Sequence, residues 1–366
     1  MKAEKIYHEK EPIYFSYSLN EWQLSYTKRR STIVENSEGA ENQGKSKEML
    51  RSTFTRELLR ARDCKPEECP KIVTGFDIGR SYEGRLIRGL KLSFKSGKKS
   101  IFIESNIHAR EWITSAACTY LIMELLFSKN PDVREMAESL DWWMVPVLNV
   151  DGFVYSHEKE RLWRKTRRPA ANSDCVGVDL NRNFNFKWEL KKCEDPCSNK
   201  YSGPYAQSEP EVEQLTNFIN NNISEDSLKI YIALHSPAQA VLTPWTHTKI
   251  PPRRYGELMY VANAFADALY TRYHTRYACG NSGNMLKMFS GGSKDWAYAA
   301  KRVPIAYTIE LPGKGRPSPF ELPEKAILRT SAEMLDGFIG MIKAVKQLET
   351  TLISHRIRPM ACIWSR

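Results

Sequence analysis

Apolar and polar positions follow two different repeats along the chain from residue 70 onward. Short apolar runs predict strands, and longer segments with apolar positions three and four residues apart predict helices. The predicted strands are 71–78, 90–94, 99–106, 141–148, 229–234 and 303–311. The predicted helices are 114–127, 131–140, 210–220, 255–273 and 323–346. Strands that alternate with helices indicate an α/β fold, with a central sheet and helices on both of its faces.

The two ends of the chain lack this alternation. Residues 1–69 are charged, mixed in sign and poor in periodic apolar positions, so we expect a poorly ordered N-terminal extension. Residues 70–350 are expected to form one domain and residues 351–366 a tail. The first 20 residues also lack the apolar core of a secretory signal peptide, which taken alone favours an intracellular protein.

Composition narrows the function classes. The chain has 366 residues, of which 42% are hydrophobic, and a net charge of +11. Such a charge favours acidic partners, either nucleic acid or acidic peptides, or it is simply a solvated basic surface. The sequence contains no basic heptad region, zinc-finger spacing or RNP-type aromatic pattern, so nothing but charge supports nucleic-acid binding. We therefore expect no nucleic-acid partner. We also expect no membrane partner, since no apolar run reaches the roughly 18 residues of a membrane span.

The eight cysteines carry a signal about the cellular compartment. None of them forms a Cys-x-x-Cys pair, which argues against a zinc ribbon or a thioredoxin motif. Cys193 and Cys197 lie in a polar loop, which is more typical of disulfide chemistry in a secreted protein. The cysteines and the first 20 residues therefore favour different compartments.

Five polar positions could form one site. His108 and Glu111 are three residues apart where a predicted strand meets a predicted helix, and open α/β sheets usually keep their sites at such junctions. His235 ends an apolar strand, where it is either a third metal ligand or a histidine satisfied within the core. Glu310 lies inside another apolar strand. Burying a carboxylate costs free energy unless a partner such as a metal-bound water compensates its charge. Arg182 stands among amide side chains and suits the binding of a carboxylate.

Several short motifs, in their order along the chain, resemble those of the A/B-type zinc carboxypeptidases. They are Ile78-Gly-Arg-Ser-Tyr-Glu-Gly-Arg85, His108-Ala-Arg-Glu-Trp112, Leu162-Trp-Arg-Lys-Thr-Arg167, Asp179-Leu-Asn-Arg-Asn183, His235-Ser236, Ser290-Gly-Gly-Ser293 with Asp295-Trp296, and Glu310. The resemblance covers residues from about 70 to 346. It implies a single domain built on a mixed, twisted sheet of about eight strands, a monomer, and secretion from the cell.

The resemblance implies a hydrolase that removes C-terminal residues from peptides or proteins. One zinc ion would be held by His108, Glu111 and His235, with water in the open position. Glu310 would take a proton from that water and deliver it to the leaving amine, and Arg167 would stabilise the oxyanion. The implied substrate contacts are Asn181 and Arg182 at the terminal carboxylate, and Arg110 and Arg164 along the approach. The resemblance also implies a disulfide between Cys175 and Cys197.

Three positions depart from the family's pattern. Lys287 stands where the family usually has a tyrosine that closes over the substrate, so we expect it to contact the substrate as a mobile charge, with weaker binding and a lower rate. Pro237 replaces an aromatic residue that is frequent in the family. Lys294 lies where the family has the base of its specificity pocket, and a lysine there predicts a preference for C-terminal Glu or Asp. The alternative is that Lys294 extends to solvent and leaves a mixed apolar pocket.

Three other functions are compatible with parts of the sequence. The departures at Lys287 and Pro237 fit a catalytically silent homologue that binds peptides, although binding alone would not require Glu310. The net charge by itself suggests nucleic-acid binding. A cytosolic deglutamylating carboxypeptidase would also need a basic pocket, but the Ala-Arg pair between His108 and Glu111 argues against that branch.

Overall fold

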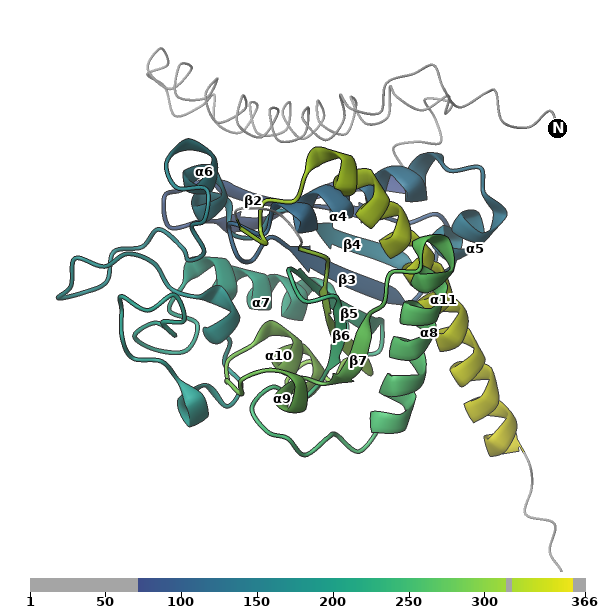
Figure 1. The fold of residues 1–366 in the computed structure, drawn as a ribbon. Coiled ribbons are helices and arrows are strands. Elements are labelled where there is room, and N and C mark those ends of the chain that lie inside the picture. Colours follow the sequence, from purple (N-terminus) through teal and green to yellow (C-terminus); the bar gives the residue numbers. More distant parts are fainter. Residues whose placement is uncertain (1–71, 314–317, 358–366) are drawn as a thin grey trace, which may run out of the picture. The chain divides into compact units, whose positions relative to one another are not determined.

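The structure, a computed structural model, describes residues 72–313 and 318–357 (Figure 1). The predicted extension, residues 1–69, lies outside the described residues. Of the predicted tail, residues 351–357 continue the last helix, and residues 358–366 lie outside the described residues. No helix in the described ranges combines the length and the apolar character needed to cross a membrane.

A mixed sheet of eight strands forms the centre of the domain, which confirms the predicted α/β fold. Its strands are β1 (Val73–Arg80), β2 (Leu86–Leu92), β3 (Ser100–Ser105), β4 (Asp141–Val145), β5 (Leu228–His235), β6 (Ala240–Thr243), β7 (Ala278–Asn281) and β8 (Ile305–Glu310). Their order across the sheet is β1-β2-β4-β3-β5-β8-β6-β7. The central strands β4, β3, β5 and β8 run parallel, whereas β1, β2 and β6 pair antiparallel to their inner neighbours.

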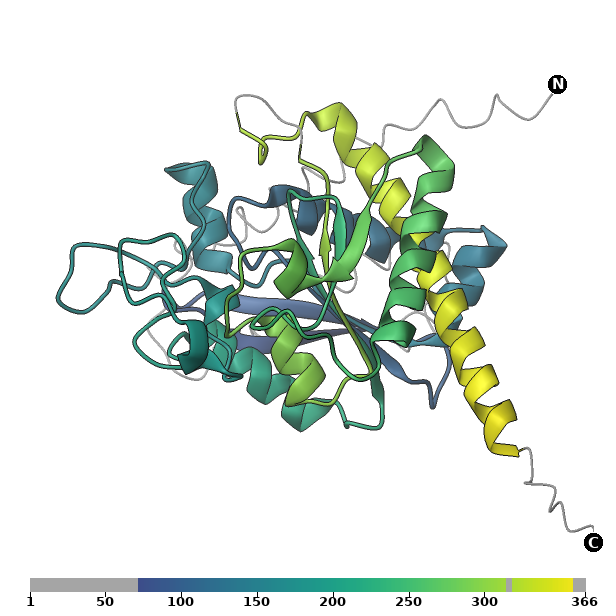
Figure 2. The same cartoon turned by 60° about the horizontal axis from the view of Figure 1, so that its bottom comes forward.

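Helices cover both faces of this sheet (Figures 1 and 2). The helices are α4 (Trp112–Phe127), α5 (Pro131–Ser139), α6 (Val150–Glu158), α7 (Pro210–Asn222), α8 (Tyr255–Tyr273), α9 (Ser282–Met285), α10 (Ser293–Ala299) and α11 (Glu324–Ile357). Short 3₁₀ turns span Leu180–Arg182 and Trp188–Lys191. Helices α4, α8 and α11 pack side by side, with α11 in contact with both of the others. Helix α7 contacts β1, and α10 contacts β5 and β8.

Alternating side chains of the strands build a core on each face, as the pleat of a strand requires. Phe102 and Tyr231 stack on one face and belong to a buried cluster that includes residues of α7 and α10. On the other face, Trp142 of β4 packs edge-on against Phe338 of α11, which in turn contacts Phe265 of α8. The central strands are therefore covered on both sides, and their near-continuous apolar sequence follows from that burial.

The parallel strands bring distant parts of the sequence to one edge of the sheet. His235 at the end of β5 is the register partner of Glu310 at the end of β8. Strand β3 ends beside β5, with Ser105 opposite Leu234, and the chain reaches His108 three residues later. The polar positions singled out in the sequence thus gather beyond the carboxyl ends of β3, β5 and β8, where open α/β sheets hold their ligands.

Candidate active site

Two histidines and a glutamate converge at this edge. Nδ1 of His108 lies 2.8 Å from Oε1 of Glu111, and Nδ1 of His235 lies 3.1 Å from Oε2 of Glu111. The two Nδ1 atoms are themselves 3.1 Å apart. All three side chains are buried, and their ligand atoms lie within 4.8 Å of one another. Two imidazole nitrogens and a carboxylate that face a common point form a donor set suited to a zinc ion.

Asp179, at the start of the first 3₁₀ turn, fixes the orientation of His108. Its Oδ1 lies 3.1 Å from Nε2 of His108 and accepts the backbone N–H of Asn181. A proton held on Nε2 by this carboxylate leaves Nδ1 free to bind a metal. Burial alone would raise the pKa of Asp179, but Arg164, Arg182 and His108 together hold it well below its usual range. Asp179 therefore stays ionised and keeps His108 in the ligand tautomer.

Glu310 lies beside the histidine of the neighbouring strand and is half-buried. Burial, reinforced by the like charge of Glu111, raises its pKa to about 7, while His235 and Arg164 act in the opposite direction. A carboxyl group with a pKa near neutrality can take up and release a proton under ordinary conditions. The position and the pKa of Glu310 thus suit a general base next to the candidate metal centre.

The structure places Arg164, and not Arg167, beside Glu111 and Asp179. Nη1 of Arg164 lies 3.7 Å from Oε1 of Glu111, and its Nη2 donates to Oδ2 of Asp179 at 2.8 Å. The guanidinium of Arg167 instead stacks on the rings of Tyr155 and Trp163, at 3.5 Å and 4.4 Å. Within the described ranges Arg167 forms no ion pair with Glu111 or Asp179. Both arginines belong to an irregular segment, so their spacing in the sequence did not indicate which of them faces the site.

The predicted carboxylate clamp lies next to the metal ligands. Nδ2 of Asn181 is 3.3 Å from Nε2 of His235, and its Oδ1 accepts the backbone N–H of Ser293 at 3.0 Å. Arg182 is buried and donates from Nη1 to the carbonyl of Asn181 at 2.8 Å. Burial, with Arg164 acting in the same direction and Asp179 opposing it, lowers the pKa of Arg182 to about 10.

Two of the remaining predicted substrate contacts are Arg110 and Lys287. The guanidinium of Arg110 packs on the ring of Phe320 at 4.1 Å, and its Nη1 donates to the carbonyl of Leu162 at 3.5 Å. Lys287 is exposed in the segment between α9 and α10. A contact between Lys287 and a substrate therefore stays a prediction.

Lys294, at the start of α10, is buried, in contrast to the alternative in which it extends to solvent. Its Nζ donates to the carbonyl of Thr243 at 2.9 Å and to Oγ of Ser282. Oδ1 of Asp295 lies 3.9 Å away. Burial lowers the pKa of Lys294 to about 8 against the opposing effect of Asp295 and Glu310. The ammonium group is thus buried inside the domain and is surrounded by hydrogen-bond acceptors and a carboxylate.

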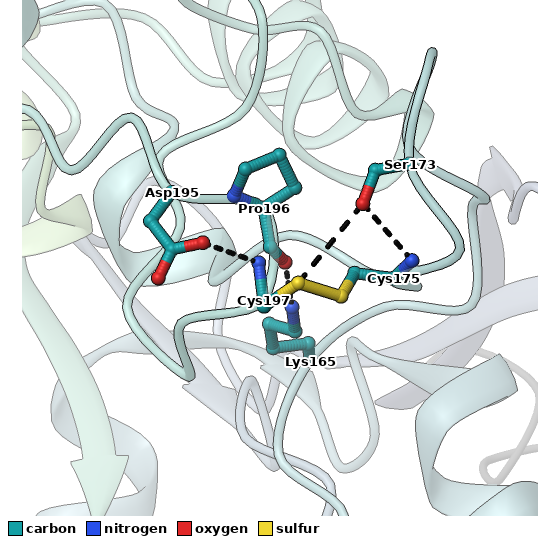
Figure 3. Close-up of a disulfide and its surroundings, with 6 residues drawn as sticks. All are labelled: Lys165, Ser173, Cys175, Asp195, Pro196 and Cys197. Atoms are coloured by element: carbon teal, nitrogen blue, oxygen red, sulfur yellow. Dashed lines mark hydrogen bonds between the residues drawn. A yellow bond between two sulfur atoms is a disulfide. The ribbon is translucent and has the colours of Figure 1, made fainter.

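The predicted disulfide joins Cys175 to Cys197 (Figure 3). Lys165, next to Arg164 in the sequence, donates from Nζ to the carbonyl of Pro196 at 2.6 Å and so ties the disulfide loop to this segment. Among the described residues, Cys118, Cys193 and Cys279 are free thiols.

Asp179 and Ser282 are among the site residues to which the sequence assigned no role. Asp179 carried a weak signal, because it directly precedes the clamp residues in a short polar motif. Ser282 carried none, since its contact with Lys294 joins segments that lie 12 residues apart and depends on the folded loop.

Comparison with known proteins places these observations in a family. The model of the zinc carboxypeptidase family matches residues 60–337. A zinc carboxypeptidase of Simulium vittatum is 44% identical over 283 residues, which cover 77% of this chain and 92% of that protein. Zinc carboxypeptidase A 1 of Anopheles gambiae is 40% identical over 278 residues, but the chain spans only 64% of its length.

Solved structures show the same similarity. Bovine thrombin-activatable fibrinolysis inhibitor, in complex with tick carboxypeptidase inhibitor, superimposes with a TM-score of 0.71 at 33% identity. The match covers 81% of this chain and 96% of the bovine chain. Carboxypeptidase A from Helicoverpa armigera superimposes with a TM-score of 0.72 at 28% identity, over 81% of this chain and 73% of that chain.

Proposed function

The chain belongs to the zinc carboxypeptidase family of peptide hydrolases, and we propose that it removes the C-terminal residue of peptides or proteins with one zinc ion. The observation that carries this proposal is the convergence of His108, Glu111 and His235 at 2.8 to 3.1 Å beside Glu310. A zinc ion held by these three residues would supply Lewis-acid chemistry, polarising a carbonyl group and making water more acidic.

The protein's own residues would perform the proton transfer and stabilise the developing charge. Glu310 would hold the proton taken from the attacking water and pass it to the nitrogen of the leaving amine. Arg164, fixed by its bonds to Asp179, would present its guanidinium to the negative charge that develops on the carbonyl oxygen. We therefore assign to Arg164 the role that the sequence had suggested for Arg167.

The exopeptidase character of the proposed reaction comes from the clamp. Arg182 can bind a terminal carboxylate with parallel hydrogen bonds, and Asn181 lies between this arginine and His235. An internal peptide segment has no carboxylate at that place. The clamp therefore favours the last peptide bond of a chain.

We also propose a preference for substrates that end in Glu or Asp. Lys294 donates two hydrogen bonds within the described part of the chain, and an ammonium group has three N–H donors. We assign the third donor and the positive charge to a carboxylate of the substrate's terminal side chain. A C-terminal Lys or Arg would instead bring a second buried cation close to Lys294, at a high cost in free energy.

We also propose that the protein is secreted and acts as a monomer. The Cys175–Cys197 disulfide supports an oxidising compartment and thus secretion. We take residues 70–350 as the catalytic unit and expect a monomer that acts on peptide or protein C-termini. Gel filtration and localisation of the expressed chain test these points directly.

The test of the reaction combines metal analysis with a peptide panel. Zinc-loaded protein is assayed on matched peptides that end in Glu, Phe or Arg, with C-terminal amides as controls. We expect release of the terminal amino acid from the free acids alone, with Glu fastest. Glu310→Gln should retain zinc and lose roughly 10²- to 10⁴-fold in kcat. Bound zinc without turnover of any peptide would support the catalytically silent peptide-binding homologue instead.

A further inference from the structure

Phe289 lies face-on against the arginine of the clamp. The guanidinium carbon of Arg182 is 3.3 Å from the centroid of the Phe289 ring. The same ring borders Gly292, where an added Cβ would lie 3.2 Å from Cε2 of Phe289 and 3.2 Å from Oδ1 of Asn181. The ring, the glycine and the two clamp residues therefore form one surface.

Hydrogen bonds and one close backbone contact hold residues 289–291 in place, and this fixes the position of the Phe289 ring beside Arg182. The N–H of Phe289 donates to the carbonyl of Thr246 at 3.3 Å. Oγ of Ser290 donates to the carbonyl of Trp188 at 2.9 Å. Gly291 has a φ of +72°, and an added Cβ there would meet the carbonyl oxygen of Arg182 at 2.2 Å. This close approach holds residues 289–291 directly against the clamp.

Arg182 needs such support because little else holds its guanidinium. In the described part of the chain, its hydrogen bond is the one from Nη1 to the neighbouring carbonyl of Asn181, and Asp179 lies 3.7 Å away. An aromatic face beside a desolvated guanidinium is attractive through the ring quadrupole. Stacking covers one face of the guanidinium plane and leaves its N–H edge available, and that edge is what a carboxylate binds.

We propose that Phe289 is a positioning residue for substrate binding, whose ring holds the Arg182 guanidinium with its N–H edge toward the terminal carboxylate. Phe289 is partly exposed, so it contributes to the wall of the site and not to the interior core. The inference rests on the proposed role of Arg182 in carboxylate binding. Because every substrate carries a terminal carboxylate, the effect of Phe289 is independent of the C-terminal side chain.

Three substitutions separate stacking from mere packing. Phe289→Ala and Phe289→Leu should raise KM roughly tenfold for peptides ending in Glu and in Phe alike, since a cation–π contact between a buried guanidinium and a partly exposed ring falls between the exposed and the desolvated cases. Leucine keeps apolar bulk but has no aromatic face. Phe289→Tyr should restore KM to within about twofold of wild type by keeping that face. In all three variants we expect kcat, zinc content and melting temperature to stay close to wild type.

Several results would overturn the proposal. A Leu variant with wild-type KM would show that only apolar bulk matters, and a lower KM in the Ala variant would show that the ring blocks the pocket. A loss of kcat with unchanged KM, or a rise in KM confined to one peptide, would equally contradict a role in carboxylate positioning.

A binding measurement distinguishes this inference from the proposed reaction. Zinc-loaded wild-type and Phe289→Leu proteins are titrated with 3-phenylpropanoate and, as a control, with its uncharged amide. Weaker binding of the carboxylate in the variant, with the amide unaffected, supports the role of Phe289 even if no peptide is hydrolysed. Equal binding of the carboxylate by both proteins refutes it even if the peptide assay succeeds.

Discussion

Nε2 of His108 lies 3.1 Å from Oδ1 of Asp179 at the buried end of the candidate metal centre. This contact does more than join two side chains. It places the imidazole proton on the nitrogen that faces away from Glu111 and His235, so that Nδ1 presents its lone pair to the metal. Since Asp179 also accepts two hydrogen bonds from Arg164, one carboxylate orients both a metal ligand and the proposed oxyanion-stabilising group.

Asp179→Asn should therefore weaken zinc binding. The amide keeps the size of the side chain but loses the charge that stabilises the tautomer, and loss of such a partner usually costs 10- to 100-fold in metal affinity. Competition titration with a chelator of known affinity measures the change. Asp141→Asn, which removes a carboxylate paired with Lys91 at the start of β4, is the matched control and should bind zinc as wild type does. Equal affinities in the two variants would contradict the role given to Asp179.

The sequence indicated the long elements of the fold better than the short ones. The predicted helix 255–273 coincides with α8, because 19 residues carry five turns of a clear apolar pattern. Strands β6 and β7 have four residues each and were not predicted, since so short a run has no measurable repeat. Helix α11 continues to Ile357, beyond the predicted end at residue 346, where the chain still lacks a helix-breaking residue.

The site was predictable where local motifs carried it. His108 and Glu111 lie within one short motif, His235 ends one apolar strand and Glu310 lies inside another, so their types and positions already suggested a common centre. That the Arg164 side chain points toward Glu111 and Asp179 could not be predicted, because an irregular segment has no repeat that assigns side chains to a face. The surroundings of Lys294 were equally hidden, since its partners are Thr243 at the end of β6 and Ser282 at the start of α9, two separate elements.

The two arginines of the irregular segment should differ sharply in their effect on catalysis. Arg164→Gln is expected to lower kcat by roughly 10²- to 10³-fold, the usual cost of removing a group that stabilises a developing oxyanion. Arg167→Gln removes a cation that stacks on Tyr155 and Trp163 and should leave kcat within a few-fold of wild type. Steady-state kinetics on one peptide, with zinc content measured in parallel, check this. A larger loss in the Arg167 variant would restore the assignment made from the sequence.

Acid selectivity should depend on pH through Lys294. Burial lowers the pKa of this side chain to about 8, so the ammonium is charged below that pH and neutral above it. The ratio of kcat/KM for a peptide ending in Glu to that for one ending in Leu should fall about tenfold between pH 7 and pH 9. Ionisations that affect both peptides, including that of Glu310, cancel in this ratio. Lys294→Met should give a low ratio that does not change with pH, and a pH-independent ratio in wild type would argue against a lysine at the base of the pocket.

Glu211, in the first turn of α7, should make the folded domain less stable as the pH rises. Its Oε1 accepts the N–H of Tyr82 at 3.1 Å, whereas Oε2 is buried without a hydrogen-bond partner among the described residues. Burial raises its pKa to about 8, and the nearby Glu209 and Asp151 act in the same direction. The folded pKa lies above the unfolded value, so the folded state binds the extra proton and stability falls between about pH 4.5 and pH 8.

Glu211→Gln removes this titration and keeps the acceptor for Tyr82. We expect the variant to match wild type near pH 5 and to be more stable at pH 8, by on the order of 4 kcal/mol. Thermal unfolding followed by circular dichroism across this pH range measures the difference. Glu213→Gln is the matched control, because Glu213 lies in the same turn of α7 but is exposed. If both variants shift the melting temperature equally at every pH, the effect comes from the surface charge of α7 and not from the buried carboxyl.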